Sequence, residues 1–275
     1  MKSILDPALQ TLIEQQVPAA QAAVSVITLP GLTGLSAKVI SEHRVFLARR
    51  EAPQPIPFIS RQREFNLLKK LATSGLTPRG LRRNRQWLLM EWLDGTEITQ
   101  LQLQTRLPEL VSLITHLHHQ PLSGYRIPLL PMLERYWQLC LNRHIGWLRA
   151  LQTLQRQGEP QPLRLAMLHM DIHSGNLIST RQGLRLIDWE YAGDGDIALE
   201  LAALIASNGF PAQQRDALLY DYAERNQLDE RQLRRQLTRW QPWLRLLMAS
   251  WFQLRAEQSQ DEAMHQQART AWQML

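Results

Sequence analysis

The sequence is poor in cysteine, because Cys140 is the only one in 275 residues. An intrachain disulfide is therefore impossible, and a zinc site built from cysteines is excluded. Long apolar runs are also absent, since no stretch approaches the roughly 18 uninterrupted apolar residues of a membrane span. The opening residues, MKSILDPALQ, lack the apolar core of a signal peptide. We therefore expect a cytoplasmic protein without a membrane partner.

A concentrated patch of positive charge is missing too. The formal net charge is +6, but the 31 lysines and arginines are mostly arginines, and they are spread along the chain without a lysine-rich tail. Nucleic-acid binding is one reading of such a charge, yet no recognised nucleic-acid motif is present. A positive cleft for a nucleoside triphosphate, or a solvated surface, accounts for the charge equally well.

Internal repeats and low-complexity tracts are absent, and the residue pattern changes near residue 95. Short apolar and β-branched runs come first, with strands predicted at 22–28, 38–40, 44–49 and 86–92 and a helix at 60–71. Helical periodicity then dominates, at 100–118, 129–156, 197–206, 213–225, 229–239, 242–257 and 261–274. One short hairpin, at 177–188, interrupts these helices. The pattern predicts an α+β protein with a small β-rich lobe over 1–94 and a mainly helical lobe over 95–275.

The most informative residues lie around that hairpin. Residues 168–177 read LHMDIHSGNL, an H-x-D-x-x-x-x-N pattern that ends in Asn176 before Leu177. Asp188 follows twelve residues after this asparagine, at the end of a predicted strand. Phosphoryl transfer needs a group that orients the acceptor hydroxyl and cations that neutralise the phosphate. Asp171 can accept the hydroxyl proton, while Asn176 and Asp188 are hard oxygen donors suited to Mg²⁺.

This arrangement resembles the small-molecule kinases of the choline kinase and aminoglycoside phosphotransferase group. The resemblance implies a protein-kinase-like two-lobed fold, ATP and Mg²⁺ as cofactors, and catalytic roles for Asp171, Asn176 and Asp188. Glu190 follows two residues later and either helps with metal or substrate or is a surface glutamate. Asp196 is expected to cap the helix that begins at Ile197, and in these kinases the matching aspartate supports the catalytic loop.

The resemblance also places nucleotide contacts in the first lobe. The phosphate-covering loop matches Gly31, Thr33, Gly34 and Ser36, although two glycines alone also suit a plain turn. Backbone groups near Glu91 and Leu93, in the connector between the lobes, are expected to bind the adenine edge.

Protein kinases place a phosphate-binding lysine on the next long strand, and here that strand carries arginine. We take Arg49 as the phosphate contact, with Arg50 as the alternative. Arginine presents a fork of donors rather than a point charge. Glu64, on the helix at 60–71, matches the glutamate that pairs with this cation, and a solvated surface position is the alternative.

Further blocks narrow the resemblance to the thiamine kinases within this group. Residues 125–131 read YRIPLLP and residues 240–244 read WQPWL, and the likeness runs over 110–255. It implies that thiamine is phosphorylated by ATP to thiamine monophosphate. Aromatic faces attract the cationic thiazolium ring, so Trp189, Trp240 and Trp243 are candidate substrate contacts. Burial in the core is the alternative for each of them.

Other functions remain open on the sequence alone. A kinase for choline, an aminoglycoside or another amino alcohol would use the same fold, but a carboxylate-rich aminoglycoside pocket is not favoured by the arginine-rich and tryptophan-rich C-terminal helices. A catalytically inactive, kinase-like binding module is disfavoured because Asp171, Asn176 and Asp188 are all present. We expect small-molecule substrates only, with no nucleic acid and no obligate protein partner.

Overall fold

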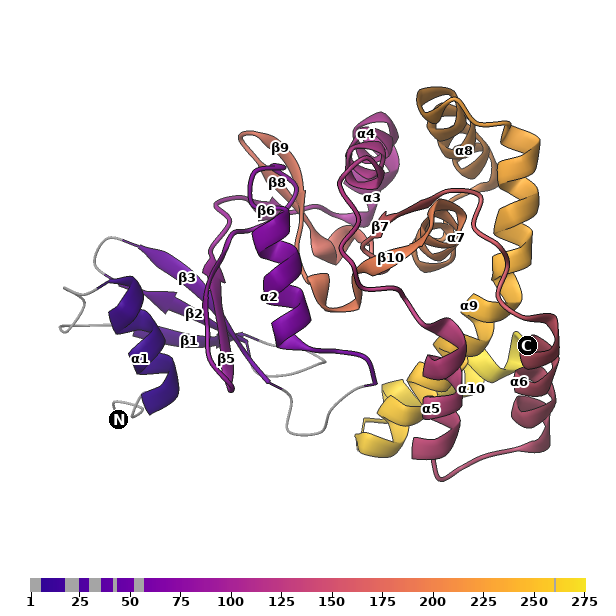
Figure 1. The fold of residues 1–275 in the computed structure, drawn as a ribbon, viewed down its shortest axis with the longest axis horizontal. Coiled ribbons are helices and arrows are strands. Elements are labelled where there is room, and N and C mark those ends of the chain that lie inside the picture. Colours follow the sequence, from indigo (N-terminus) through magenta and orange to yellow (C-terminus); the bar gives the residue numbers. More distant parts are fainter. Residues whose placement is uncertain (1–5, 18–24, 30–35, 42–43, 52–56, 260) are drawn as a thin grey trace. The chain divides into compact units, whose positions relative to one another are not determined.

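The computed structural model describes residues 6–17, 25–29, 36–41, 44–51, 57–259 and 261–275. The chain forms two compact units, one from residues 1–123 and 171–192 and the other from residues 124–170 and 193–275. Figure 1 shows the helices and strands of both. These units are defined by contacts between residues, so the functional boundary at residue 94 stays a prediction.

The first unit contains most of the strands. Its helices are α1 (Pro7–Gln16), α2 (Arg61–Lys70), α3 (Gln100–Thr105) and α4 (Leu107–His118), with short 3₁₀ turns η1 (Ser174–Asn176) and η2 (Trp189–Tyr191). Its strands are β1 (Ser25–Leu29), β2 (Ser36–Ile40), β3 (Val45–Arg50), β4 (Gly80–Arg83), β5 (Trp87–Glu91), β6 (Thr96–Glu97), β8 (Leu177–Thr180) and β9 (Gly183–Leu186).

The main sheet is antiparallel, with strand order β1-β2-β3-β5-β4. Leu9, Leu12 and Ile13 of α1 pack against one face, in a cluster that includes Phe46 and Trp87. Burying one such apolar side chain stabilises the folded state by about 1.5–3 kcal/mol. Because side chains alternate along a strand, Arg49 lies on the opposite face from Phe46 and Ala48. Figure 1 shows α1 and α2 on opposite sides of this sheet.

The predicted hairpin at 177–188 is present as β8 and β9, which pair antiparallel and are joined to β6 in a three-stranded sheet. The turn closes at Gly183, whose φ of 112° is readily adopted only by glycine. The hairpin therefore connects the asparagine at the end of η1 to Asp188, which lies two residues after the end of β9.

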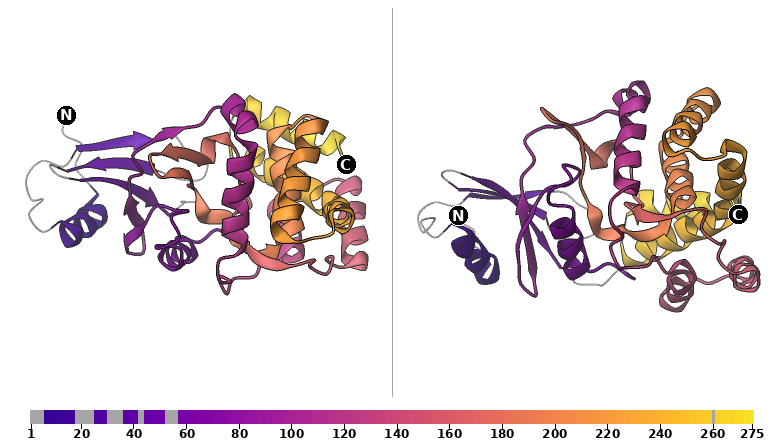
Figure 2. Two further views of the ribbon diagram at one scale, coloured as in Figure 1. Left: turned by 90° about the horizontal axis from the view of Figure 1, so that it is seen from above. Right: turned by 45° about the horizontal axis from the view of Figure 1, so that its top comes forward.

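The second unit is mainly helical. Its elements are α5 (Leu129–Leu139), α6 (Ile145–Gln157), β7 (Leu165–Leu168), β10 (Gly193–Asp196), α7 (Ile197–Asn208), α8 (Ala212–Asn226), α9 (Glu230–Gln258) and α10 (Glu262–Gln273). The strands β7 and β10 pair antiparallel. The other five helices of this unit all contact α9, and Figure 2 gives two further views of them. The α+β fold class is thus confirmed, with a β-sheet region first and a helical region after it.

Two predicted helices are interrupted in the structure. The helix predicted at 100–118 stops at Thr105 and restarts at Leu107, because Pro108 cannot donate the hydrogen bond that would continue it. The helix predicted at 129–156 breaks at residues 140–144. There Glu257 accepts hydrogen bonds from the backbone of the break, a contact that periodicity does not reveal.

Two other predicted helices, at 229–239 and 242–257, form one continuous helix, α9, with Pro242 inside it. A proline inside a helix costs about 3 kcal/mol. Trp240, Trp243 and Leu246 are buried on both sides of it, so packing outweighs this cost. The strands β4, β6, β7 and β10, of two to four residues each, were not predicted. Throughout the described part of the chain, no helix is both long and apolar enough to span a membrane.

Candidate active site

The loop at residues 171–176 folds back on itself and brings Asp171 and Asn176 together. The Asn176 side-chain nitrogen donates to the Asp171 backbone carbonyl and to its carboxylate oxygen Oδ2, each over 2.9 Å. The backbone N–H of Asn176 donates to His173 O over 2.9 Å, and Gly175 N donates to His173 Nδ1 over 3.1 Å. Since Nδ2 is occupied by Asp171, the side-chain oxygen of Asn176 is the atom available to a metal.

Asp188 follows β9 in a left-handed backbone conformation, with φ 65° and ψ 63°. A residue with a side chain adopts this conformation at some energetic cost, and such positions cluster at functional sites. The backbone N–H of Ile187 donates to Asn176 O over 3.0 Å, which ties the two segments together. The Asp188 side chain remains 32% exposed. A carboxylate on a tied but accessible segment can reach a bound ion.

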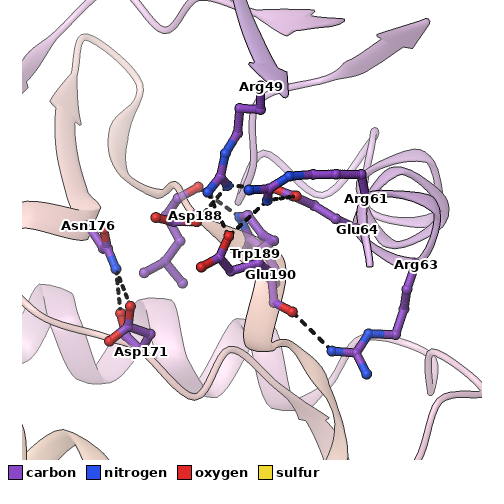
Figure 3. Close-up of polar contacts among 10 residues, drawn as sticks. Arg49, Arg61, Arg63, Glu64, Asp171, Asn176, Asp188, Trp189 and Glu190 are labelled. Atoms are coloured by element: carbon purple, nitrogen blue, oxygen red, sulfur yellow. Dashed lines mark hydrogen bonds and ion pairs between the residues drawn. The ribbon is translucent and has the colours of Figure 1, made fainter. Parts of the chain in front are cut away.

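Arg49 lies on β3 among three carboxylates (Figure 3). Its Nη1 is 2.7 Å from Glu64 Oε1 and 2.5 Å from Asp188 Oδ1, and its Nη2 is 2.8 Å from Glu190 Oε2. The side chains of Glu64 and Glu190 are each only 1% exposed. The predicted pairing of Arg49 with Glu64 is therefore present, and it is a buried ion pair rather than a surface one.

Two arginines of α2 that sequence reasoning missed complete this cluster. Arg61 Nη1 donates to Glu64 Oε2 over 2.6 Å and to Glu190 Oε2 over 2.8 Å. Arg63 Nη2 donates to the backbone carbonyl of Glu190 over 2.9 Å. The spacing of Arg61 three residues before Glu64 is a signal for an ion pair on one helix face. Nothing in the sequence, however, indicates that Glu190 joins them.

The charges of the cluster affect one another. Burial disfavours the charged form of Arg49, but Glu64, Asp188 and Glu190 outweigh that effect and raise the pKa of its guanidinium. For Glu190, burial and then the Asp188 carboxylate raise the pKa above its usual value, and Arg49 and Arg61 oppose this rise. Arg49 therefore stays a cation at any physiological pH.

The structure separates the two candidate phosphate-binding arginines. Arg50 points to the other face of β3, where its guanidinium lies 5.8 Å from the Trp87 ring centroid and 3.9 Å from Asp6 Oδ2. Ser36 is the register partner of Arg49 on the adjacent strand, so their side chains share one face. Three other predicted loop residues, Gly31, Thr33 and Gly34, lie outside the described residues.

The predicted adenine-binding segment begins where β5 ends. The backbone N–H of Glu91 donates to Arg79 O over 2.9 Å, and its side chain accepts from the Arg79 backbone over 3.1 Å. Leu93 lies two residues beyond the end of the strand. The Glu91 amide is thus engaged within the protein, and a role for Glu91 and Leu93 in adenine binding stays a prediction.

The three candidate tryptophans are buried. Within the first unit, Trp189 is 0% exposed and its indole N–H donates to Leu186 O over 2.9 Å. Within the second unit, Trp240 and Trp243 are each 2% exposed, and the Trp240 indole donates to Asp196 Oδ2 over 2.8 Å. Asp196 also caps α7, as predicted, by accepting from the backbone of Ala198. These contacts give the tryptophans packing roles, and their substrate roles stay predictions.

Comparison with known proteins identifies relatives along almost the whole chain. Thiamine kinase from Salmonella typhimurium LT2 is 43% identical over 259 residues, which cover 91% of this chain and 90% of that one. Thiamine kinase from Escherichia coli O139:H28 is 42% identical over 250 residues, which cover 89% of this chain and 88% of that one.

Solved structures show the same fold at low sequence identity. Choline kinase LicA from Streptococcus pneumoniae matches with a TM-score of 0.76 and 18% identity, over 96% of this chain and 98% of that one. Aminoglycoside phosphotransferase APH(4)-Ia matches with a TM-score of 0.64 and 14% identity, over 96% and 97%. The predicted protein-kinase-like fold is thereby confirmed.

The model of the phosphotransferase enzyme family matches residues 31–237, which is more than half of the chain and includes Arg49, Asp171, Asn176 and Asp188. Together with the relatives above, this match shows that the chain belongs to the phosphotransferase enzyme family, whose kinases use ATP.

Proposed function

We propose that this protein is a thiamine kinase, which transfers the terminal phosphoryl group of ATP to the hydroxyl of thiamine. The observation that carries the proposal is the likeness to thiamine kinases, at 42–43% identity over about nine-tenths of both chains. The site supports it, because Asp171 and Asn176 are hydrogen-bonded neighbours on a loop tied to the segment of Asp188.

Asp171 has the role of orienting the acceptor. Its carboxylate is 32% exposed and accepts a hydrogen bond from Asn176, so it is both held in place and accessible. The acceptor oxygen attacks the terminal phosphorus while the bond to the bridging oxygen of ADP breaks. The hydroxyl proton passes to Asp171, and ADP leaves with the bonding electron pair.

Asn176 and Asp188 fit the role of Mg²⁺ ligands. Mg²⁺ prefers oxygen ligands, and the bonds from Asn176 Nδ2 to Asp171 fix the amide so that Oδ1 is left for an ion. Asp188 is accessible, whereas Glu190 is buried against two arginines, so Asp188 rather than Glu190 is the carboxylate ligand. When bound, Mg²⁺ neutralises the phosphate oxygens and orients the triphosphate.

Arg49 and its surroundings hold the nucleotide in this proposal. The guanidinium already lies beside Asp188, so a triphosphate that reaches the metal site also meets Arg49. Ser36 on the neighbouring strand, and Gly31, Thr33 and Gly34 before it, are proposed to cover the phosphates. Glu91 and Leu93 are proposed to meet the adenine through backbone groups.

An acceptor comparison tests the proposal. The purified protein is incubated with ATP, MgCl₂ and one of four alcohols: thiamine, its pyrimidine alcohol precursor, choline or an aminoglycoside. ADP release is followed by a coupled assay, and the phosphorylated product is identified by mass spectrometry. We expect thiamine monophosphate, with kcat/KM for thiamine at least roughly tenfold above the others. Turnover of choline or the aminoglycoside without turnover of thiamine would contradict the proposal.

A further inference from the structure

The ion pairs around Asp188 share few cations. Among the described residues, the carboxylates of Glu64, Asp188 and Glu190 are ion-paired with two guanidiniums, those of Arg49 and Arg61. The third guanidinium of the cluster, that of Arg63, binds the backbone carbonyl of Glu190 instead of a carboxylate. The side chains of both glutamates and of Arg61 are no more than 3% exposed. Buried charges are tolerated only when they are paired, so each glutamate needs a cation at every stage of the reaction.

Arg49 and Arg61 contact different sets of these carboxylates. Arg49 contacts all three, with Nη1 shared between Glu64 and Asp188 and Nη2 on Glu190. Arg61 contacts the two glutamates through Nη1, over 2.6 and 2.8 Å. The backbone of Arg61 is fixed by secondary structure, because Arg61 is the first residue of α2 and Ser60 caps the N-terminus of this helix. Arg61 is thus fixed on a helix beside the glutamates, while Arg49 links them to the metal-binding aspartate (Figure 3).

The hydrogen bonding of this cluster is incomplete. Arg61 Nε and Glu190 Oε1 are buried and, among the described residues, have no hydrogen-bond partner. Buried ion pairs of this kind contribute little to folding stability, because apolar residues of similar volume in their place often leave the protein equally stable or more stable. The cluster is therefore poorly explained as a stabilising device, and a role in the reaction accounts for it better.

We infer that Arg61 is a positioning residue that frees Arg49 for the nucleotide. This inference rests on the proposed function, because it concerns the step in which Asp188 takes up Mg²⁺ and Arg49 turns to phosphate. As Arg49 turns, Arg61 remains as the cation that neutralises Glu64 and Glu190. Without Arg61, both glutamates depend on Arg49 alone, and Arg49 is held back from the phosphate.

Loss of Arg61 is expected to affect nucleotide affinity and thiamine affinity differently. The glutamates and the phosphates of the nucleotide compete for Arg49. Loss of Arg61 strengthens the hold of the glutamates on Arg49 and therefore weakens nucleotide binding. It leaves thiamine affinity in place, because the polar contacts that Arg61 makes among the described residues are to Glu64 and Glu190, beside Arg49. A residue that merely supported the fold would weaken both affinities together and lower the melting temperature.

The test compares Arg61→Met, Arg61→Lys and Arg61→Met combined with Glu190→Gln, with the exposed surface change Arg85→Met as the control. Calorimetric titration with ADP and Mg²⁺, without thiamine, gives the nucleotide Kd, and steady-state kinetics give both KM values. We expect the Kd and the KM for ATP to rise about tenfold in Arg61→Met, the loss expected for one hydrogen bond to a charged group. Arg61→Lys and the double variant should recover part of this loss, the first by restoring a cation and the second by removing a carboxylate. Thermal unfolding checks that each variant is folded.

Two results would overturn the inference: unchanged nucleotide affinity in folded Arg61→Met, or a parallel loss of nucleotide and thiamine affinity that neither Arg61→Lys nor Glu190→Gln relieves. Because the titration needs no acceptor, its outcome is independent of whether thiamine is the substrate. Failure of thiamine phosphorylation in the unmodified protein would instead count against the proposed function.

Discussion

The side-chain nitrogen of Asn176 donates two hydrogen bonds to Asp171, one to its backbone carbonyl and one to its carboxylate, both over 2.9 Å. One amide thus holds the proposed base with its nitrogen and keeps its oxygen for a metal. The two functions can be separated by changing only one of the two atoms.

Asn176→Asp makes that separation, since it keeps an oxygen for Mg²⁺ but replaces the donor with a second carboxylate oxygen. Two carboxylates at this distance repel each other, so Asp171 is displaced or becomes protonated. We expect kcat to fall by at least roughly tenfold, within the range for general-base contributions, while the Kd for ADP with Mg²⁺ changes little. Steady-state kinetics and calorimetry measure the two effects, and an unchanged kcat would show that the hydrogen bond is unimportant.

The Asp188 carboxylate is expected to act through the metal. In Asp188→Asn, one oxygen ligand loses its charge, and the salt bridge to Arg49 is lost as well. We expect ADP affinity in the presence of Mg²⁺ to fall about tenfold or more, the cost of losing a charged contact. Affinity measured with EDTA should change far less. Equal losses with and without Mg²⁺ would remove the metal role of Asp188.

Much of the catalytic loop was predictable because its chemistry is local. Asp171 and Asn176 are five residues apart, and a hairpin of about ten residues brings Asp188 to them. The Arg61–Glu190 pair was not predictable, because it joins residues 129 positions apart and depends on how α2 packs against η2. Glu190 was expected to help with metal or substrate or to lie on the surface, and the structure buries it.

The tryptophans illustrate the same limit. Periodicity places Trp243 on the helix predicted at 242–257 and leaves Trp240 between two predicted helices, and it does not say which side of a helix is covered. Two separate helices were predicted at 229–239 and 242–257, whereas the structure has one continuous helix, α9, which passes through Pro242 and packs against its neighbours. Local rules predicted the cap at Asp196, whereas its bonds to Gln236 and Trp240 are tertiary contacts over 2.6 and 2.8 Å.

Trp240→Phe tests the packing role of that indole. The change removes the donor to buried Asp196 Oδ2 and leaves most of the apolar ring. We expect the free energy of unfolding to fall by about 1–3 kcal/mol, the range for a lost hydrogen bond to a charged group. Urea unfolding measures this change. If the KM for thiamine rose tenfold with stability unchanged, Trp240 would be a substrate contact instead.

Cys140 should be an unreactive thiol. It is 1% exposed, and burial, followed by the nearby Glu257 carboxylate, raises its pKa from 9.0 to about 12. The folded state therefore favours the neutral thiol. This contribution to stability is fully present below pH 9 and is lost as the pH rises towards 12.

We expect iodoacetamide at pH 8 to leave Cys140 unmodified in the folded protein and to alkylate it after unfolding in urea. Mass spectrometry of the intact chain measures the modification. Rapid alkylation of the folded protein would show that the thiol is accessible and ionised.

The most direct test of the account concerns Asp171. In Asp171→Asn, the side chain keeps its size and polarity but cannot accept the thiamine proton. Thiamine monophosphate formation should fall by a factor of about 10² to 10⁴, while ADP still binds in the presence of Mg²⁺ with nearly the affinity of the unmodified protein. Phosphorylation of thiamine at a normal rate by this variant would contradict the assigned chemistry.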